Sequence, residues 1–144
     1  MYMKVNFLTL LTLFFFNISF AQITKYDDWD IAKQQSELTG KNILIILTGS
    51  EWCKPCVKME KDVIENQQFI EYANQNLVVL EIDIPRNQNY DSKVMKDYMY
   101  FKNKYSTNAL PTMILVDKNG TEKISLSDNL NSLEKVLEGL KKYN

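Results

Sequence analysis

The middle of the chain carries an unbroken run of leucine and isoleucine side chains at residues 43–47, which a Thr-Gly-Ser segment at residues 48–50 ends. A strand that offers no polar residue to water must be covered on both faces, as happens in a sheet flanked by helices. Directly after it, the apolar spacing changes to three- and four-residue steps over residues 53–76, which is the period of a helix. The sequence therefore predicts a buried strand that passes into a long helix.

The rest of the chain continues this alternation of helices and strands. Asp28 is expected to cap the first helix and Gly40 to end it, and Asn119-Gly120 marks the centre of a predicted hairpin turn. A chain of 144 residues has room for one domain. The predicted fold is α/β, a central mixed sheet with a C-terminal antiparallel hairpin and helices on both faces. The remaining helices are predicted at residues 26–39, 92–105 and 131–143, and the remaining strands at residues 77–84, 112–116 and 121–126.

The first 21 residues have the organisation of a secretory signal peptide. Lys4 precedes an almost continuously apolar stretch at residues 7–16, and Ser19 and Ala21 occupy the −3 and −1 positions of a cleavage site before Gln22. An uncleaved anchor or a buried first helix are the alternatives, but the apolar stretch is short for a membrane span. We therefore expect residues 1–21 to be removed and residues 22–144 to form the exported domain, in an oxidising compartment.

The chain contains no histidine and two cysteines, Cys53 and Cys56. The lack of histidine excludes His-based acid–base catalysis and catalytic triads, and together with the cysteine count it excludes a four-ligand Cys/His zinc site within one chain. A c-type haem needs His after the second cysteine, where this chain has Val57. The net charge of −1 gives no electrostatic signal for nucleic acid, so no nucleic-acid partner is expected. Redox chemistry remains, with no cofactor or metal beyond the redox-active disulfide Cys53–Cys56.

The position of this pair favours reactivity. Cys53 falls where a strand passes into a helix, and the unpaired N–H groups and dipole of a helix N-terminus favour a thiolate, which is the attacking species. Cys56, one turn further, is expected to be more buried and to resolve a mixed disulfide formed on Cys53. Pro55 is tolerated in a first helical turn, and Lys54 adds a positive charge nearby. The alternatives are an inert structural bridge, which stabilises little across so short a loop, and an intermolecular metal clip.

Two motifs resemble the thioredoxin superfamily: Trp52-Cys53-Lys54-Pro55-Cys56 and Leu110-Pro111-Thr112. Residues 56–63, and the first helix with Trp29 followed by residues 40–44, are similar to the C-terminal domain of periplasmic thiol:disulfide interchange reductases. The resemblance implies that the Leu110–Pro111 peptide bond is cis and that the backbone of Leu110 pairs with a client chain as an added strand. It also implies a set of catalytic and client-binding residues: Cys53 and Cys56, with Trp52, Lys54, Pro55, Leu110 and Pro111.

The sequence departs from the best-known members of this superfamily at one buried pair. They carry a carboxylate six residues before the first cysteine and a lysine on the next strand, and the matching positions here are taken to be Leu47 and Val79. A solitary buried charge is costly, so the loss of both together is physically coherent. Glu51 is then the nearest carboxylate that could relay a proton through water, the alternative being a solvated loop acid.

We expect a protein-disulfide reductase that acts on disulfides of exported proteins through a Cys53 mixed disulfide resolved by Cys56. The expected compartment is the bacterial periplasm, with full secretion as the alternative. The expected partners are disulfide-containing exported proteins and a membrane thiol–disulfide electron donor, and the chain is expected to act as a monomer. The alternative functions are a disulfide oxidase or isomerase, and a client-binding module with little turnover.

Overall fold

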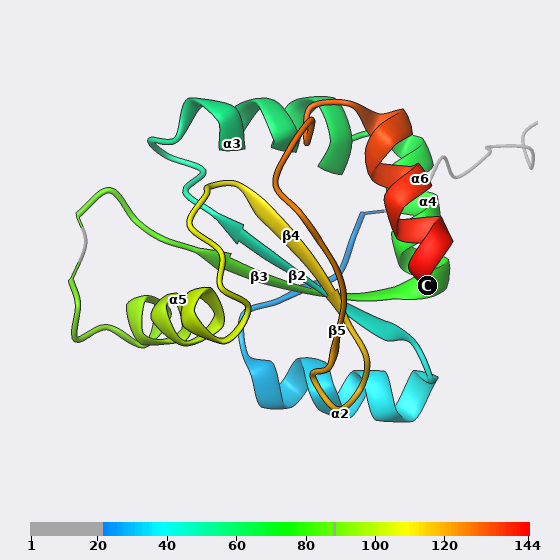
Figure 1. Cartoon of the computed structure of the whole chain (residues 1–144), viewed down its shortest axis with the longest axis horizontal. Helices are drawn as coiled ribbons and strands as arrows, with labels where there is room; N and C mark the ends of the chain where they lie inside the picture. Colours follow the sequence, from blue (N-terminus) through cyan, green and yellow to red (C-terminus); the bar gives the residue numbers. More distant parts are fainter. Residues whose placement is uncertain (1–21, 88) are drawn as a thin grey trace, which may run out of the picture.

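The computed structural model describes residues 22–87 and 89–144, so the predicted signal peptide at residues 1–21 lies outside the described residues. The strands form one five-stranded sheet in the order β1-β3-β2-β4-β5 (Figure 1). In chain order the elements are β1 (Lys25–Tyr26), α2 (Trp29–Thr39), β2 (Asn42–Thr48), α3 (Lys54–Met59), the π-helical turn η2 (Glu60–Ile64), α4 (Gln67–Asn76), β3 (Leu77–Asp83), α5 (Lys93–Lys104), β4 (Thr112–Val116), β5 (Glu122–Leu126) and α6 (Leu133–Tyr143).

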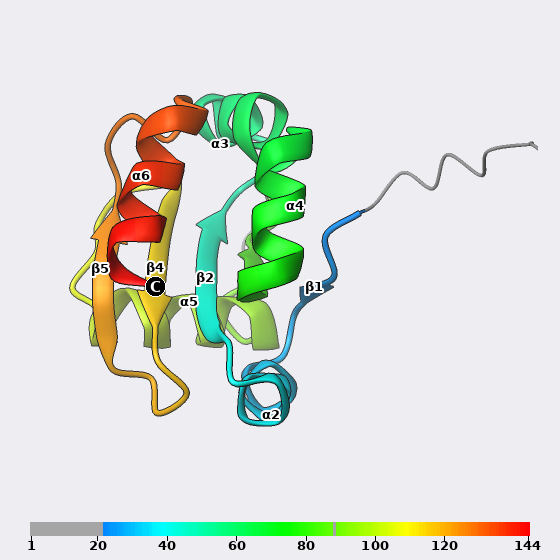
Figure 2. The ribbon, with the colours of Figure 1, turned by 90° about the vertical axis from the view of Figure 1, so that its right-hand side faces the viewer.

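The sheet is mixed, and helices cover both of its faces, as predicted. β1, β3 and β2 run parallel, whereas β4 is antiparallel to β2 and β5 is antiparallel to β4. Figures 1 and 2 show α3, α4 and α6 on one face of the sheet and α2 and α5 on the other. In the part of the chain that the structure describes, no helix is both long and apolar enough to cross a bilayer.

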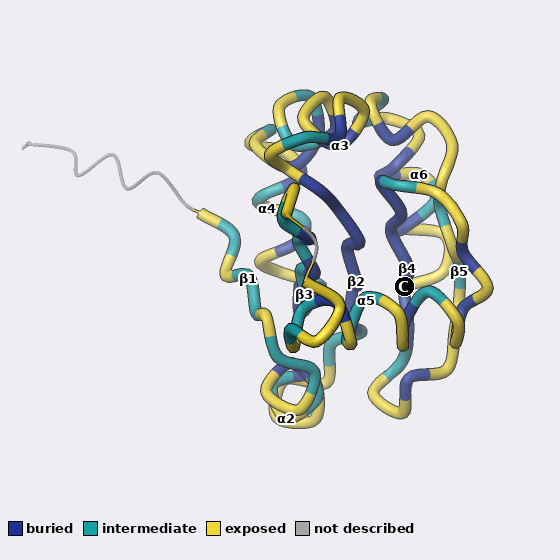
Figure 3. The backbone as a smooth tube through the Cα atoms, turned by 90° about the vertical axis from the view of Figure 1, so that its left-hand side faces the viewer, coloured by how far each residue is buried: buried dark blue, intermediate teal, exposed yellow. Residues whose placement is uncertain are grey.

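The apolar run of β2 explains this layered arrangement. All five side chains of residues 43–47 are 0% exposed, and Figure 3 shows β2 as buried along most of its length. Successive strand residues point to opposite faces, so Leu44 and Ile46 pack with the α3, α4 and α6 layer. Ile43, Ile45 and Leu47 pack with α2 and α5. Each such side chain contributes about 1.5–3 kcal/mol by leaving water, which makes β2 the common centre of two cores.

The single long helix predicted for residues 53–76 is wrong. The structure has α3, then η2, then a break at Glu65–Asn66, and only then α4. Glu65 closes the π turn by donating to the Glu60 carbonyl oxygen at 2.9 Å. Asn66 adopts an extended conformation and caps α4, because its side-chain oxygen accepts from the Gln68 N–H. The apolar spacing continues on both sides of the break, so the period alone could not reveal it.

The first helix and the hairpin turn also differ from expectation. Tyr26, predicted to open the helix, lies in β1 beside β3, and the helix begins at Trp29 with Asp28 as its cap and Gly40 after its end. In the hairpin, the Gly120 N–H donates to the Asp117 carbonyl oxygen at 2.9 Å, so Asn119-Gly120 is not the centre of the turn. Gly120 instead follows the turn with a φ of +76°, the left-handed conformation typical of three-residue hairpin loops.

Candidate active site

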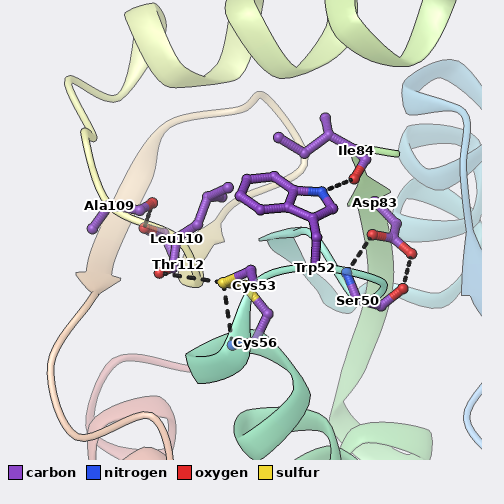
Figure 4. Close-up of a disulfide and its surroundings, with 9 residues drawn as sticks. All are labelled: Ser50, Trp52, Cys53, Cys56, Asp83, Ile84, Ala109, Leu110 and Thr112. Carbon is purple, nitrogen blue, oxygen red and sulfur yellow. Dashed lines mark hydrogen bonds between the residues drawn. A yellow bond between two sulfur atoms is a disulfide. The ribbon is translucent and has the colours of Figure 1, made fainter. Parts of the chain in front are cut away.

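The two cysteines lie at the carboxyl end of β2, where the chain turns into α3 (Figure 4). A tight turn brings the chain round, because the N–H groups of Trp52 and Cys53 both donate to the Gly49 carbonyl oxygen. Cys53 is the residue that caps α3, and it is joined to Cys56 by a disulfide across a Cα–Cα distance of 5.2 Å. The predicted placement of the pair at a strand-to-helix junction is confirmed.

Burial and hydrogen bonding distinguish the two sulfur atoms. Cys53 is 7% exposed and Cys56 is 0% exposed, so of the two residues only Cys53 keeps any contact with solvent. The Cys56 N–H donates to Cys53 Sγ at 3.3 Å, and the Val57 N–H donates to the Cys53 carbonyl oxygen. A backbone N–H aimed at Sγ would stabilise negative charge there after reduction, which is the arrangement that makes a cysteine nucleophilic.

The Leu110–Pro111 segment lies against the first sulfur. Its peptide bond is cis, as the family resemblance implied, and the Leu110 carbonyl oxygen is 3.8 Å from Cys53 Sγ. The segment is held by Thr112, whose hydroxyl donates to the Ala109 carbonyl oxygen at 2.8 Å and lies 3.0 Å from the Thr107 hydroxyl oxygen. Figure 4 shows Leu110 and Cys53 side by side, so the structure brings together the two motifs that are separated in the sequence.

Trp52 is half-buried beside the pair, and the edge of its ring that carries Nε1 is held in place. Its Nε1–H donates to the Ile84 carbonyl oxygen at 2.8 Å (Figure 4). Gly49 lies under the ring, where an added Cβ would be 2.7 Å from Cε2 of the indole. Position 49 therefore has to be glycine for Trp52 to keep this place, a requirement that the sequence analysis missed.

Asp83, at the end of β3, holds the turn of residues 49–53 that carries Cys53. The sequence analysis missed this contact. Asp83 accepts from the Ser50 N–H at 2.8 Å through Oδ1 and from the Ser50 hydroxyl through Oδ2 (Figure 4). Arg86 donates to the Glu51 carbonyl oxygen at 3.3 Å. The signal for this contact in the sequence is Asp83 itself, a polar residue at the end of a predicted strand. Parallel neighbouring strands have their carboxyl ends at the same edge of a sheet, so Asp83 could have been expected near the end of β2.

A cluster of three charged groups lies further along the same side of the active-site helix. Lys25 Nζ is 2.7 Å from an oxygen of Glu60, on η2, and 2.6 Å from an oxygen of Glu81, on β3. Burial raises the pKa of Glu81 above its usual value, although Lys25 opposes this effect. Burial alone would lower the pKa of Lys25, but hydrogen bonds and charge from both carboxylates hold it above its usual value.

The expected replacement of a buried acid–lysine pair by Leu47 and Val79 is only partly correct. Leu47 is fully buried, but its neighbour on β3 is Ile82, and Val79 lies opposite Leu44. Leu47 and Val79 also pack on opposite faces of the sheet. Because Ile82 is itself apolar and 2% exposed, the position beside Leu47 still lacks a charged partner. The strand register, which sequence spacing did not reveal, corrects the pairing.

Glu51, the candidate proton relay, is exposed and follows Ser50 in the turn. Within residues 22–87 and 89–144, no hydrogen bond or ion pair joins its carboxylate to either cysteine. Its relay role stays a prediction. In the same described ranges, no group of three or more Cys, Asp or Glu side chains is arranged to hold a metal ion.

Lys54 and Pro55 are exposed and border a pocket of about 400 Å³ on the other side of α3. Pro111, which is buried and follows Leu110 in the cis peptide bond, also lines this pocket. The remaining lining residues are Lys58, Ser127, Asn129, Leu130 and Asn131. A larger hollow of about 720 Å³ lies between β1, β3 and α5, and none of its lining residues belongs to the cysteine turn or to the Leu110–Pro111 segment.

Comparison with known proteins gives relatives that share this architecture. The chain is 24% identical over 98 residues to the disulfide bond reductase DsbH of Chlamydia pneumoniae, which covers 68% of this chain and 59% of that protein. It is 24% identical over 101 residues to the thiol:disulfide interchange protein DsbD of Campylobacter jejuni, covering 70% of this chain and 16% of that protein. The chain thus spans less than two thirds of the length of either relative.

A solved structure described as a DsbH oxidoreductase superposes with a TM-score of 0.75, at 20% identity, over 85% of each chain. That likeness confirms the predicted fold. The model of the thioredoxin-like domain family matches residues 29–137, which takes in the cysteine turn, the cis proline and every strand of the sheet after β1. With most of its length matched, and with the reactive pair placed as the resemblance implied, the chain belongs to the thioredoxin-like domain family.

Proposed function

We propose that this chain is a thiol–disulfide oxidoreductase that reduces disulfides of exported proteins through Cys53. The observation that carries the proposal is the asymmetry of the pair. Cys53 keeps a small exposed fraction of 7% and has a backbone N–H directed at its sulfur, whereas Cys56 is fully buried. One sulfur is thus accessible to a client and the other is accessible only to the first.

The exchange has two steps. In the reduced chain, the Cys53 thiolate attacks one sulfur of a client disulfide, forms a Cys53–client mixed disulfide and releases the other client sulfur as a thiolate. The Cys56 thiolate then attacks Cys53 Sγ, re-forms the Cys53–Cys56 bond and releases the second client thiolate. Two electrons pass from the dithiol to the client, and the released thiolates take up protons. Leu110, whose carbonyl oxygen lies beside Cys53 Sγ, offers its backbone to the client segment.

Reduction is the favoured direction because DsbH of Chlamydia pneumoniae, of which 59% is covered, is named a disulfide bond reductase. The same site has a feature that favours an oxidase: the Cys56 N–H, which points at Cys53 Sγ, would stabilise a Cys53 thiolate and hence the reduced state, and the charge of the neighbouring Lys54 acts in the same direction. The reduction potential of the pair decides between them. A reduction potential of about −270 mV, typical of thioredoxin, agrees with a reductase, whereas a potential of about −120 mV indicates an oxidase.

The proposed location is the periplasm, reached through the signal-peptide pattern of residues 1–21. The oxidised pair must then be re-reduced there, and a membrane thiol–disulfide carrier is the proposed electron donor. The named thiol:disulfide interchange protein among the relatives supports this class of donor. Separating periplasm from medium in cells that express the full chain tests the location, and recovery of the processed chain only in the medium would contradict it.

Two assays test the activity. The reduced chain should cleave the disulfides of insulin, and Cys53→Ser should abolish the reaction. Cys56→Ser should accumulate mixed disulfides with clients, because the buried thiol that resolves them is gone. If the reduced chain leaves insulin intact and Cys56→Ser captures no client, the protein is a binding module with little turnover and the proposal is wrong.

A further inference from the structure

We propose that the pocket beside the disulfide selects client segments that carry carboxylate side chains close to the reacting cysteine. This inference rests on the proposed function, because the pocket is lined by Lys54 and Pro55, which lie between the two cysteines in the chain, and by Pro111 of the cis peptide bond. It adds a substrate class: disulfides in acidic surroundings.

The pocket combines an apolar floor with one sign of charge. Pro55, Pro111 and the buried Leu130 supply the apolar part, and Lys54 and Lys58 supply all of the charge among its lining residues. Ser127, Asn129 and Asn131 add hydroxyl and amide groups that can donate hydrogen bonds. Asp128 belongs to the same loop but does not line the pocket. A carboxylate would meet two cations and several donors here.

Lys54 and Lys58 make none of the contacts that engage many other lysines of the described chain. Lys25 and Lys93 form ion pairs, Lys41 and Lys123 donate to backbone carbonyl oxygens, and Lys102, Lys104, Lys141 and Lys142 lie over aromatic rings. Among the described residues, no ion pair, hydrogen bond or ring contact involves the amine of Lys54 or Lys58. Two cations side by side at the edge of a reactive site are therefore available to a partner.

The other side of Cys53 is already occupied. There, the Trp52 Nε1–H donates to the Ile84 carbonyl oxygen and Ser50 donates to Asp83, so these groups of the turn already have partners within the chain. A client strand paired with Leu110 would advance about 3.3 Å per residue. Because Pro111, the next residue, lines the pocket, the side chains one or two positions from the client cysteine would lie near it. The pocket would therefore bind the residues that flank the client cysteine, in addition to the contact that Cys53 makes with the cysteine itself.

The test uses the reduced full chain and three peptides, each with one cysteine held as a disulfide to 2-thiopyridine. The peptides are identical except that the residues flanking the cysteine are Glu, Gln or Lys. Release of 2-thiopyridone gives the rate constant, and each value is divided by that of 2-mercaptoethanol with the same peptide, to remove intrinsic reactivity. The Glu peptide should react about fivefold faster than the Gln peptide at low salt, and the Lys peptide should react more slowly still. The preference should shrink toward one in high salt.

Lys58 is the position to change, because it lies outside the Cys53–Cys56 loop. Lys58→Gln should lower the Glu-to-Gln rate ratio by about half, and Lys58→Glu should invert it. Lys61→Gln is the matched control: Lys61 is exposed on the same helical stretch but does not line the pocket, so the ratio should stay at the wild-type value.

The outcomes separate the two proposals. A wild-type ratio near one, with the Gln peptide reacting readily, overturns charge selection and leaves the proposed function intact. A ratio that survives both changes at Lys58 also overturns it, because the preference would then arise elsewhere. A reduced chain that reacts with none of the peptides contradicts the proposed function itself.

Discussion

The two sides of the active-site helix are built in opposite ways. On the side of β3 and β1, the closed flank, hydrogen bonds and ion pairs join Ser50, Trp52 and Glu60 to the sheet and to the loop after it. On the side of the 127–131 loop, the open flank, α3 borders a pocket. No hydrogen bond or ion pair between α3 and that loop occurs in the described part of the chain.

This difference separates two tasks that one small site must combine. Cys53 has to be held in place relative to Cys56 and Leu110, and the hydrogen bonds of the closed flank hold the turn that carries it before any client arrives. The site must also admit client segments of varied shape, which a surface with uncommitted groups does better. Changes on the closed flank should therefore cost stability and exchange together, and changes on the open flank should alter which client reacts.

The largest effect is expected from Gly49→Ala on the closed flank. The new Cβ would lie 2.7 Å from Trp52 Cε2, so the indole has to move and give up its bond to the Ile84 carbonyl oxygen. Overpacking and the lost hydrogen bond together should cost about 2–3 kcal/mol. Urea denaturation gives the stability, and indole emission reports the displaced ring.

Gly40→Ala is the matched control at the other end of the same strand. A Cβ added at position 40 would have no other atom within 4 Å, and the residue has a φ of +71°. Only backbone strain of about 1 kcal/mol is therefore expected for this variant. If Gly49→Ala costs no more than Gly40→Ala and leaves the indole emission unchanged, Trp52 is not held as described.

Lys25→Met comes next. Removing the cation leaves Glu60 and Glu81 without a partner, and a cost of about 1–2 kcal/mol is expected at neutral pH, below the range for fully buried pairs because the side chains are 20–30% exposed. Lys96→Met, an exposed change on α5, is the control. A loss no larger than that of the control would mean that this cluster does not anchor the helix.

The same variant has a pH signature. Burial already raises the pKa of Glu81, and loss of Lys25 should raise it further. A carboxyl whose pKa is higher in the folded chain costs stability while it is ionised, and this cost disappears as the pH falls through the raised pKa. The gap between Lys25→Met and the wild type should therefore be widest near pH 7–8 and should narrow toward pH 5, as measured by denaturation at each pH.

Asp83→Asn is expected to have a smaller effect. The amide can still accept one bond from Ser50 but loses the charge that strengthens both, which should cost about 1 kcal/mol and slow exchange with any client. Insulin reduction and thermal unfolding measure the two effects, with the exposed Asp91→Asn as the control. Unchanged exchange kinetics would show that the Ser50–Asp83 contact does not position Cys53.

The smallest effect is expected from Asn131→Ala on the open flank. Asn131 is exposed and lines the pocket without bonding to α3, so stability should change by less than about 0.5 kcal/mol. Thermal unfolding alone measures this. A loss comparable with that of Asp83→Asn would remove the distinction between the two flanks.

Features that one stretch of sequence contains were predictable. The buried strand β2, the Cys53–Cys56 pair at its end, the cap at Asp28 and the strand β4 all follow from local period or residue type. The cis bond before Pro111 was predictable only from the family resemblance. The fold class followed from the order of these elements, because alternation and a final hairpin leave few ways to build a mixed sheet.

The parts that could not be predicted depend on register and on contacts between distant segments. Asp83 reaches Ser50, and Lys25 reaches Glu60 and Glu81, only because the parallel strands align as they do. The same register assigns Ile82, and not Val79, to the position beside Leu47. β1 was missed because two residues are too short to show a period. The closed flank is thus a tertiary property, whereas the reactive motif is a local one.

The break between η2 and α4 has a consequence for how the molecule opens. A continuous helix from the disulfide to β3 would link the reactive end to the core as one cooperative unit. With a π turn at Glu60–Ile64 and a new cap at Asn66, the segment that carries the cysteines ends before α4 begins. Local unfolding of residues 54–64 would withdraw Met59, Val63 and Ile64 from the core and could leave α4 docked through Phe69 and Ala73. Amide protons of residues 54–64 should accordingly exchange with solvent sooner than those of Gln67–Asn76. The α3–η2 segment and α4 would then differ in their protection from hydrogen exchange.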